Sequence, residues 1–95
     1  MRRRIRIPCT VFTGMFPREV QVEIRPPGQE PIYVFTSDRS TFTGGVPVTP
    51  TGVSGFLLAT MADESAGRAV VDLPGETRPI GPRVRLVTTF IHIRD

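Results

Sequence analysis

The chain has 95 residues, of which 12 are arginine and 9 are acidic, with a net charge of +3 and a hydrophobic share of 39%. This length suits one small domain with its own core, and the composition argues against a disordered chain. The longest apolar run is too short to cross a bilayer, and Pro8 interrupts the basic start where a signal peptide would become apolar. We therefore expect one cytoplasmic domain over residues 1–95 that does not act at a membrane.

The choice of apolar residues favours strands. The chain contains 11 valines, 7 isoleucines and 11 threonines, but only 4 leucines and 4 alanines. Side chains branched at Cβ lose rotamer freedom in a helix and pack well on a pleated sheet. Nine glycines and ten prolines cut the chain into short pieces. The composition therefore predicts an all-β domain of short strands.

The first three predicted strands are close together in the chain. Residues 4–12 alternate between apolar and polar side chains, and a turn is expected at 13–17. Residues 19–25 show the most regular alternation in the sequence, and residues 32–36 resume it after a break rich in proline. These segments predict an antiparallel meander of three strands.

A long connection follows from residue 38 to residue 55. Loops of this length without structure are uncommon in compact domains unless they are functional or contain a short strand. We expect such a strand to include Phe42, Val46 and Val48, and we consider the loop a candidate surface for a partner. Residues 56–62 and 68–73 then predict a hairpin, although the helical spacing of apolar residues at 57–62 leaves one short helical turn as an alternative.

The last predicted strand spans residues 83–94 and changes its alternation midway. Val84 and Leu86 share one face, whereas Ile91 and Ile93 have the opposite parity. A bulge or sharp coil at 87–89 would bring them to the same face, and it would place Thr89 inside as well. Phe90, His92 and Arg94 would then point outward. Together, the segments predict a small antiparallel β-barrel of five or six short strands, SH3-like or OB-like in character.

Charge is distributed unevenly along the chain. Residues 1–25 carry a net charge of +4, residues 26–76 carry −4, and residues 77–95 carry +3. If the first and last strands are neighbours, their outward faces merge into one surface. The candidate binding residues on that surface are Arg4, Arg6, Phe12, Arg83, Arg85, Phe90, His92 and Arg94. Guanidinium groups interleaved with aromatic rings are typical of a nucleic-acid-binding strip.

An alternative needs no ligand. Glu19 and Glu23 face outward on the second predicted strand, where they could pair with Arg4 and Arg6 across the meander. Such cross-strand pairs contribute about 0.2 to 1 kcal/mol each. This interpretation, a solvated charged face, is the one we prefer for the arginines.

The motifs of PilZ domains, which are β-barrels that bind cyclic dinucleotides, are matched only in part. Arg2 and Arg6 fit an RxxxR pattern, and Asp38 and Ser40 fit the start of a D/NxSxxG pattern. Thr43 occupies the position of the required glycine. We therefore do not assign the chain to this family, and nucleotide binding stays a variant of the nucleic-acid hypothesis.

Several kinds of chemistry lack the residues that they require. One cysteine and one histidine cannot form a structural zinc site, which needs four such ligands. Alternation places Cys9 in the core and His92 outside, so we expect no thiol–imidazole pair, and no paired carboxylates suggest an acid and a base. We therefore expect no metal, no cofactor and no enzymatic activity.

The sequence thus predicts a non-catalytic binding or adaptor module that engages a protein partner through the loop at 38–55 or through an outer sheet face. Nucleic-acid or nucleotide binding through the arginine-rich face is the alternative.

Overall fold

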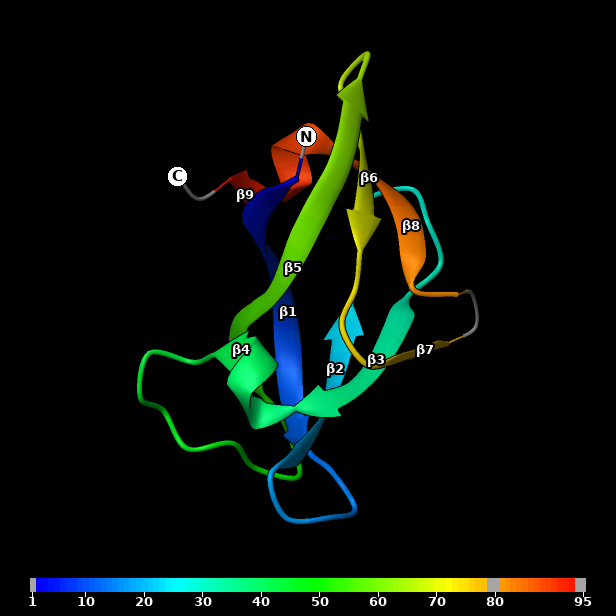
Figure 1. Ribbon diagram of the computed structural model, residues 1–95. Coiled ribbons are helices and arrows are strands. Elements are labelled where there is room, and N and C mark those ends of the chain that lie inside the picture. Colours follow the sequence, from blue (N-terminus) through cyan, green and yellow to red (C-terminus); the bar gives the residue numbers. More distant parts are fainter. Residues whose placement is uncertain (1, 79–80, 94–95) are drawn as a thin grey trace.

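The computed structural model describes residues 2–78 and 81–93, and its strands form one antiparallel sheet (Figure 1). Its strands are β1 (Arg3–Thr13), β2 (Glu19–Ile24), β3 (Ile32–Ser37), β4 (Thr41–Phe42), β5 (Val53–Ser65), β6 (Arg68–Asp72), β7 (Glu76–Arg78), β8 (Arg83–Val87) and β9 (His92–Ile93). Two single turns of 3-10 helix, Asp38–Ser40 and Thr88–Phe90, are the helical elements of the described residues. Within those residues, no helix is long and apolar enough to span a membrane.

The sheet is curled. Its strand order is β7-β3-β2-β1-β5-β6-β8, with β4 added to β5 and β9 added to β1. The curl brings the two ends of this order toward each other, so that the sheet forms a half-barrel around one core (Figure 1). The prediction of an all-β, antiparallel, barrel-like domain is confirmed. The strand count exceeds the five or six expected because three short strands, β4, β7 and β9, add to the longer ones.

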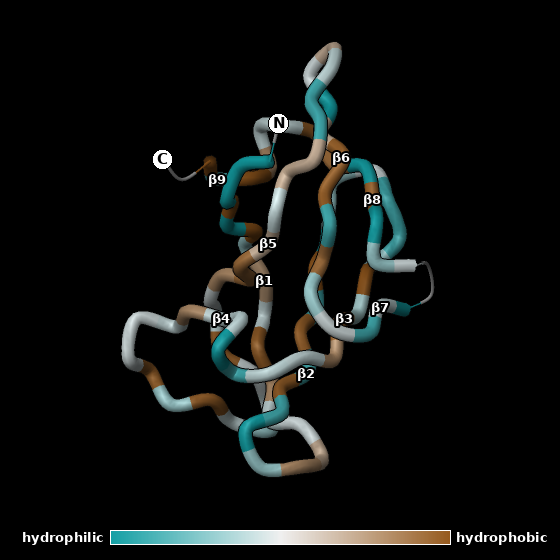
Figure 2. The backbone as a smooth tube through the Cα atoms, in the orientation of Figure 1, coloured by the Kyte–Doolittle hydropathy of each residue, from teal (hydrophilic) through white to brown (hydrophobic). Residues whose placement is uncertain are grey.

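The core comes from the alternation of the strands. Ile5, Ile7 and Val11 of β1 are fully buried, and the inward residues of β2 and β3 are buried to a similar degree. Figure 2 shows brown apolar positions alternating with teal or white ones along the strands. Because the sheet curls, these inward side chains pack against one another as a single cluster.

β5 and β6 form the longest hairpin. Ala66 and Gly67 make its two-residue turn, and both have positive φ angles, as a type I′ turn requires. The pairing shifts by one residue between Met61 and Asp63. The predicted hairpin is confirmed, with a longer first strand than expected and without the alternative helical turn.

The connection after β3 contains a short strand, which includes Phe42 but not the other two expected residues, Val46 and Val48. Phe42 pairs with Phe56 of β5, whereas Val46 lies in an irregular segment and is 52% exposed. The backbone N–H of Thr13 donates to the carbonyl of Thr49 at 3.2 Å, which ties the end of this segment to β1. The strand therefore begins immediately after the 3-10 turn at 38–40.

The break in the C-terminal strand lies where the sequence predicts it. β8 ends at Val87, and Thr88–Phe90 form a 3-10 turn before β9. Ile91 is buried and His92 is exposed, as expected, but Thr89 is exposed and Ile93 is 39% exposed. Phe90, expected outside, is half-buried against the core. A turn of three residues, rather than one inserted residue, explains these differences. Arg94 lies outside the described residues.

Candidate functional site

The first and last strands of the sheet are neighbours. β9 pairs with β1 through Ile5↔Ile93 and Arg6↔His92. Paired residues of adjacent strands share one face of the sheet, so His92 lies beside Arg6 on the outer face. Arg4 lies on the same face, two residues along β1. Three of the eight candidate residues therefore come together.

Arg83 is separated from them and already has a partner. β5 and β6 lie between β1 and β8 in the sheet. The Nε of Arg83 donates to Oδ1 of Asp72 at 2.8 Å, and Nη1 of Arg2 donates to Oδ2 of the same carboxylate at 3.0 Å. The hydrogen bond from Arg83 is the main reason that the pKa of Asp72 is lowered, and it raises the pKa of Arg83 in turn. Arg83 therefore forms an ion pair within the sheet.

The other candidate residues do not lie beside Arg4, Arg6 and His92 either. Arg85 lies on β8, where it is paired with Val70, so the β5–β6 hairpin also separates it from β1. Phe12 is half-buried beneath Gly52, at which an added Cβ would lie 2.6 Å from its ring. Phe90 packs against the core, as described above. The predicted strip is therefore not continuous.

The glutamates of β2 do not pair with Arg4 and Arg6. The expectation of cross-strand ion pairs between these residues is therefore wrong. Glu23 pairs with Thr10 near the opposite end of β1, and its carboxylate accepts hydrogen bonds from Arg25 and Tyr33. β2 covers only Thr10–Thr13 of β1, because the first strand is much longer than the second. Within residues 2–78 and 81–93, no carboxylate lies at ion-pair distance from either arginine.

An aromatic cluster surrounds Arg6 instead. Its guanidinium carbon lies 4.9 Å from the centroid of the Phe42 ring, and the rings of Phe56 and His92 meet edge to face at 5.3 Å. Phe42 is 46% exposed. We call Arg6, Phe42, Phe56 and His92 the Arg6 cluster. Neither phenylalanine is among the candidate binding residues, because alternation does not reveal that β4 adds to the edge of β5.

Arg6 is partly withdrawn from water. Its side chain is half-buried, and its Nε is fully buried with no hydrogen-bond acceptor among the described residues. A cation over an aromatic face gains about 0.5 to 2 kcal/mol, more as it loses water. An N–H group without an acceptor is costly. The cluster therefore holds a cation whose hydrogen-bonding capacity is incompletely used.

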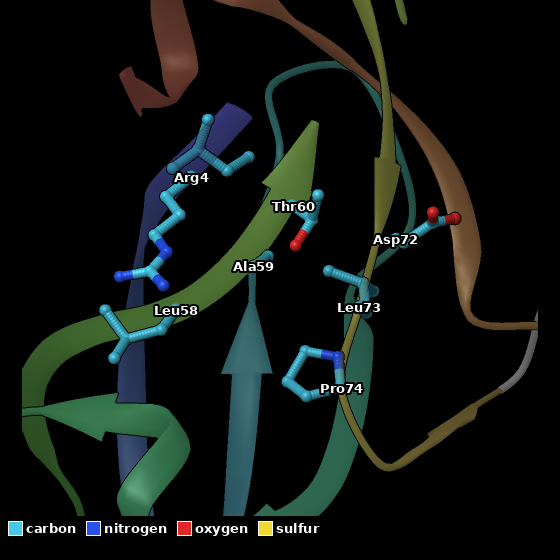
Figure 3. Close-up of a pocket in the computed structure, with 8 residues that line it drawn as sticks. Arg4, Leu58, Ala59, Thr60, Asp72, Leu73 and Pro74 are labelled. Carbon is cyan, nitrogen blue, oxygen red and sulfur yellow. The ribbon is translucent and has the colours of Figure 1, made fainter. Parts of the chain in front are cut away.

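Two hollows lie on either side of the cluster along β5. The β4 hollow has a volume of about 390 Å³ and is lined mainly by Pro8, Phe42, Thr43, Gly55 and Phe56. The β6 hollow has a volume of about 410 Å³, and Figure 3 shows Leu58, Ala59 and Thr60 on one side of it and Leu73 and Pro74 on the other, with Arg4 at its rim.

The β6 hollow results from a gap in the sheet. On the edge of β5 away from β1, the pairing with β6 ends at Thr60 and the pairing with β4 starts at Leu57. Leu58 and Ala59 have no strand partner on that edge among the described residues. After β6 ends at Asp72, the chain turns away from β5 at Leu73 and Pro74, and this opens the space that Figure 3 shows.

Cys9 and His92 lie on opposite faces of the sheet. Burial raises the pKa of Cys9 to about 12, so its thiol is neutral at physiological pH, and its position on the inner face separates it from His92. Within the part of the chain that the structure describes, no three histidine, cysteine or acidic side chains could hold a metal ion together. No family model matches the chain, and neither a curated protein nor a solved structure is significantly similar to it.

Proposed function

We propose that this protein is a non-catalytic binding module that holds a segment of a protein partner against the outer face of β1 and β5. The observation that carries the proposal is the Arg6 cluster, in which an arginine without a carboxylate partner lies on an exposed aromatic ring between two hollows. Aromatic and arginine side chains are enriched at the centres of protein interfaces, where they dominate the binding energy.

The hollows give this surface its shape. Each is large enough for one bulky side chain, and Pro8, Phe42 and Phe56 are among the residues that line the β4 hollow. Burying one large apolar side chain contributes about 1.5 to 3 kcal/mol. The arginines add attraction for a carboxylate. The chemistry therefore fits a peptide segment that combines apolar and acidic side chains.

The same geometry gives less support to nucleic-acid binding. A single strand is held by a continuous series of cations along its backbone, with bases stacked on free aromatic faces. Here Arg83 is paired with Asp72, Arg85 is separated from β1 by two strands, and one face of Phe42 is covered by Arg6. A protein segment is therefore the better-supported ligand, and a nucleic acid is the other outcome of the test.

The test is a selection of random peptides by phage display on three immobilised proteins: the wild type, Arg6→Glu and Arg68→Glu. Arg68 is an exposed arginine at the hairpin tip, so its reversal makes the same charge change away from the cluster. We expect peptides that bind the wild type and Arg68→Glu but lose at least tenfold in affinity for Arg6→Glu. Phe42→Ala should weaken them as well, and the amide NMR spectrum of each variant verifies its fold.

Two results would overturn the proposal. The first is that no peptide is selected, or that the selected peptides bind Arg6→Glu and Phe42→Ala as well as the wild type. The second is that short single-stranded DNA, RNA or a cyclic dinucleotide shifts the amide signals of the cluster at low salt, loses this effect at high salt, and competes with no peptide.

A further inference from the structure

The outer face of β1 and β5 is organised in rows. Three successive pairs of residues face outward across these strands: Arg4↔Thr60, Arg6↔Leu58 and Pro8↔Phe56. Neighbouring rows are two residues apart, which is about 7 Å along a strand. The first row and Leu58 of the second row line the β6 hollow, the third row lines the β4 hollow, and Arg6 lies between Arg4 and Pro8 on β1. The first and third rows are therefore about 13 Å apart along β1.

An extended peptide has the same repeat. Its side chains at positions i, i+2 and i+4 point to one side, and i and i+4 are about 13 Å apart. This inference rests on the proposed function. We propose that the site binds an extended segment with large apolar side chains at i and i+4 and a carboxylate at i+2. The apolar side chains occupy the two hollows, and the carboxylate meets the guanidinium of Arg6.

The negative charge proposed for position i+2 of the ligand follows from the two arginines of β1. Arg4 and Arg6 have no carboxylate at ion-pair distance within residues 2–78 and 81–93. A carboxylate placed above Leu58 receives charge-assisted hydrogen bonds from these arginines, which are stronger than bonds between neutral groups. A lysine at the same position would face two like charges.

The identity of the outer positions follows from the walls of the hollows. Leu58, Leu73 and Pro74 line the β6 hollow, and Figure 3 shows the short Thr60 side chain at its edge. Pro8 and Phe56 line the β4 hollow, beside the exposed Ser54. Short side chains at Thr60 and Ser54 leave room for a leucine or phenylalanine of the ligand.

Fluorescence polarisation with labelled synthetic peptides tests this inference. The parent peptide is Gly-Leu-Ser-Asp-Ser-Phe-Gly. One comparison peptide lacks the second serine, which changes the apolar spacing to i and i+3, and another carries lysine in place of aspartate. We expect each comparison peptide to bind at least tenfold more weakly than the parent, and Arg6→Glu to abolish the preference for aspartate over lysine.

Filling each hollow gives a second measurement. Thr60→Phe and Ser54→Phe should each weaken the parent peptide about tenfold, whereas Ser65→Phe, on the exposed end of the same strand, should not. If selected peptides bind the Arg6 cluster but the spacing and charge variants bind equally well, this inference fails and the proposed function stands. If no peptide of any kind binds the cluster, both fail.

Discussion

Replacing Gly55 with alanine should disturb β4 and the Arg6 cluster together. Gly55 lies on β5 beneath β4, and an added Cβ would be 2.7 Å from the carbonyl oxygen of Phe42, 3.2 Å from Cγ2 of Thr43 and 3.3 Å from Cγ2 of Val11. The nearest of these atoms belongs to the backbone, so it cannot rotate away as a flexible side chain would. β4 must therefore move away from β5 by several tenths of an ångström.

The expected cost combines two opposing effects. Overpacking of this kind destabilises a protein by about 1 to 3 kcal/mol. Alanine in place of glycine recovers about 0.4 to 1 kcal/mol by restricting the unfolded chain. Urea denaturation should therefore show a net loss of up to about 2.6 kcal/mol in the free energy of unfolding. Binding of peptides to the cluster should weaken as well, because Phe42 moves with β4.

Gly81→Ala is the matched control. No atom lies within 4 Å of a Cβ added at Gly81, and its φ angle is not positive, so its stability should stay the same or rise by about 0.4 to 1 kcal/mol. The reasoning is refuted if Gly55→Ala unfolds at the wild-type urea concentration and leaves the amide shifts of residues 41–43 unchanged. That result would mean that β4 does not pack closely on β5.

Three further predictions concern the core, the cysteine and the main ion pair. Leu57→Ala should lower the free energy of unfolding by about 2 to 5 kcal/mol in urea, because Leu57 is fully buried; a negligible loss would place it outside the core. At pH 8 the native Cys9 thiol should react with a disulfide reagent about a thousandfold more slowly than in the unfolded chain, because burial raises its pKa from 9.0 to about 12. The unfolded thiol ionises first as pH rises, so stability should fall between pH 9 and 12, and Cys9→Ala should remove this component of the decline. The lowered pKa of Asp72 stabilises the fold above pH 3.8 and loses that effect as the pH falls through the lowered value; Asp72→Asn should show a smaller loss of stability in acid, and equal acid sensitivity would argue against the ion pair.

The sequence predicts strands best where one face is buried and the other is not. β1, β2 and β3 lie close to their predicted boundaries because their alternation directly reflects a single core. The break after Val87 was also predictable, since the parity of the large apolar residues changes there. The exposure of Thr89 and Ile93 was not, because alternation cannot distinguish one inserted residue from a turn of three.

The candidate site was predictable only in part. Arg4, Arg6 and His92 come together because the first and last strands pair, and the outward residues of both could be read from alternation. Arg83 and Arg85 do not join them, because the hairpin of β5 and β6 is inserted between β1 and β8. The order of strands in a sheet depends on contacts between distant segments, which a pattern of two residues does not encode.

The unpaired state of Arg4 and Arg6 has a cause in strand length. β1 has 11 residues and β2 has 6, so the glutamates of β2 reach only one end of β1. At the other end β9 takes the place beside β1, and it brings a histidine opposite Arg6 instead of an acid. Asp72, which lies in the same row as Arg4 and Thr60, is already bonded to Arg83 and Arg2. The positive charge on β1 is therefore a consequence of the topology, and it should attract a carboxylate more weakly as ionic strength rises, because exposed charges are screened by salt.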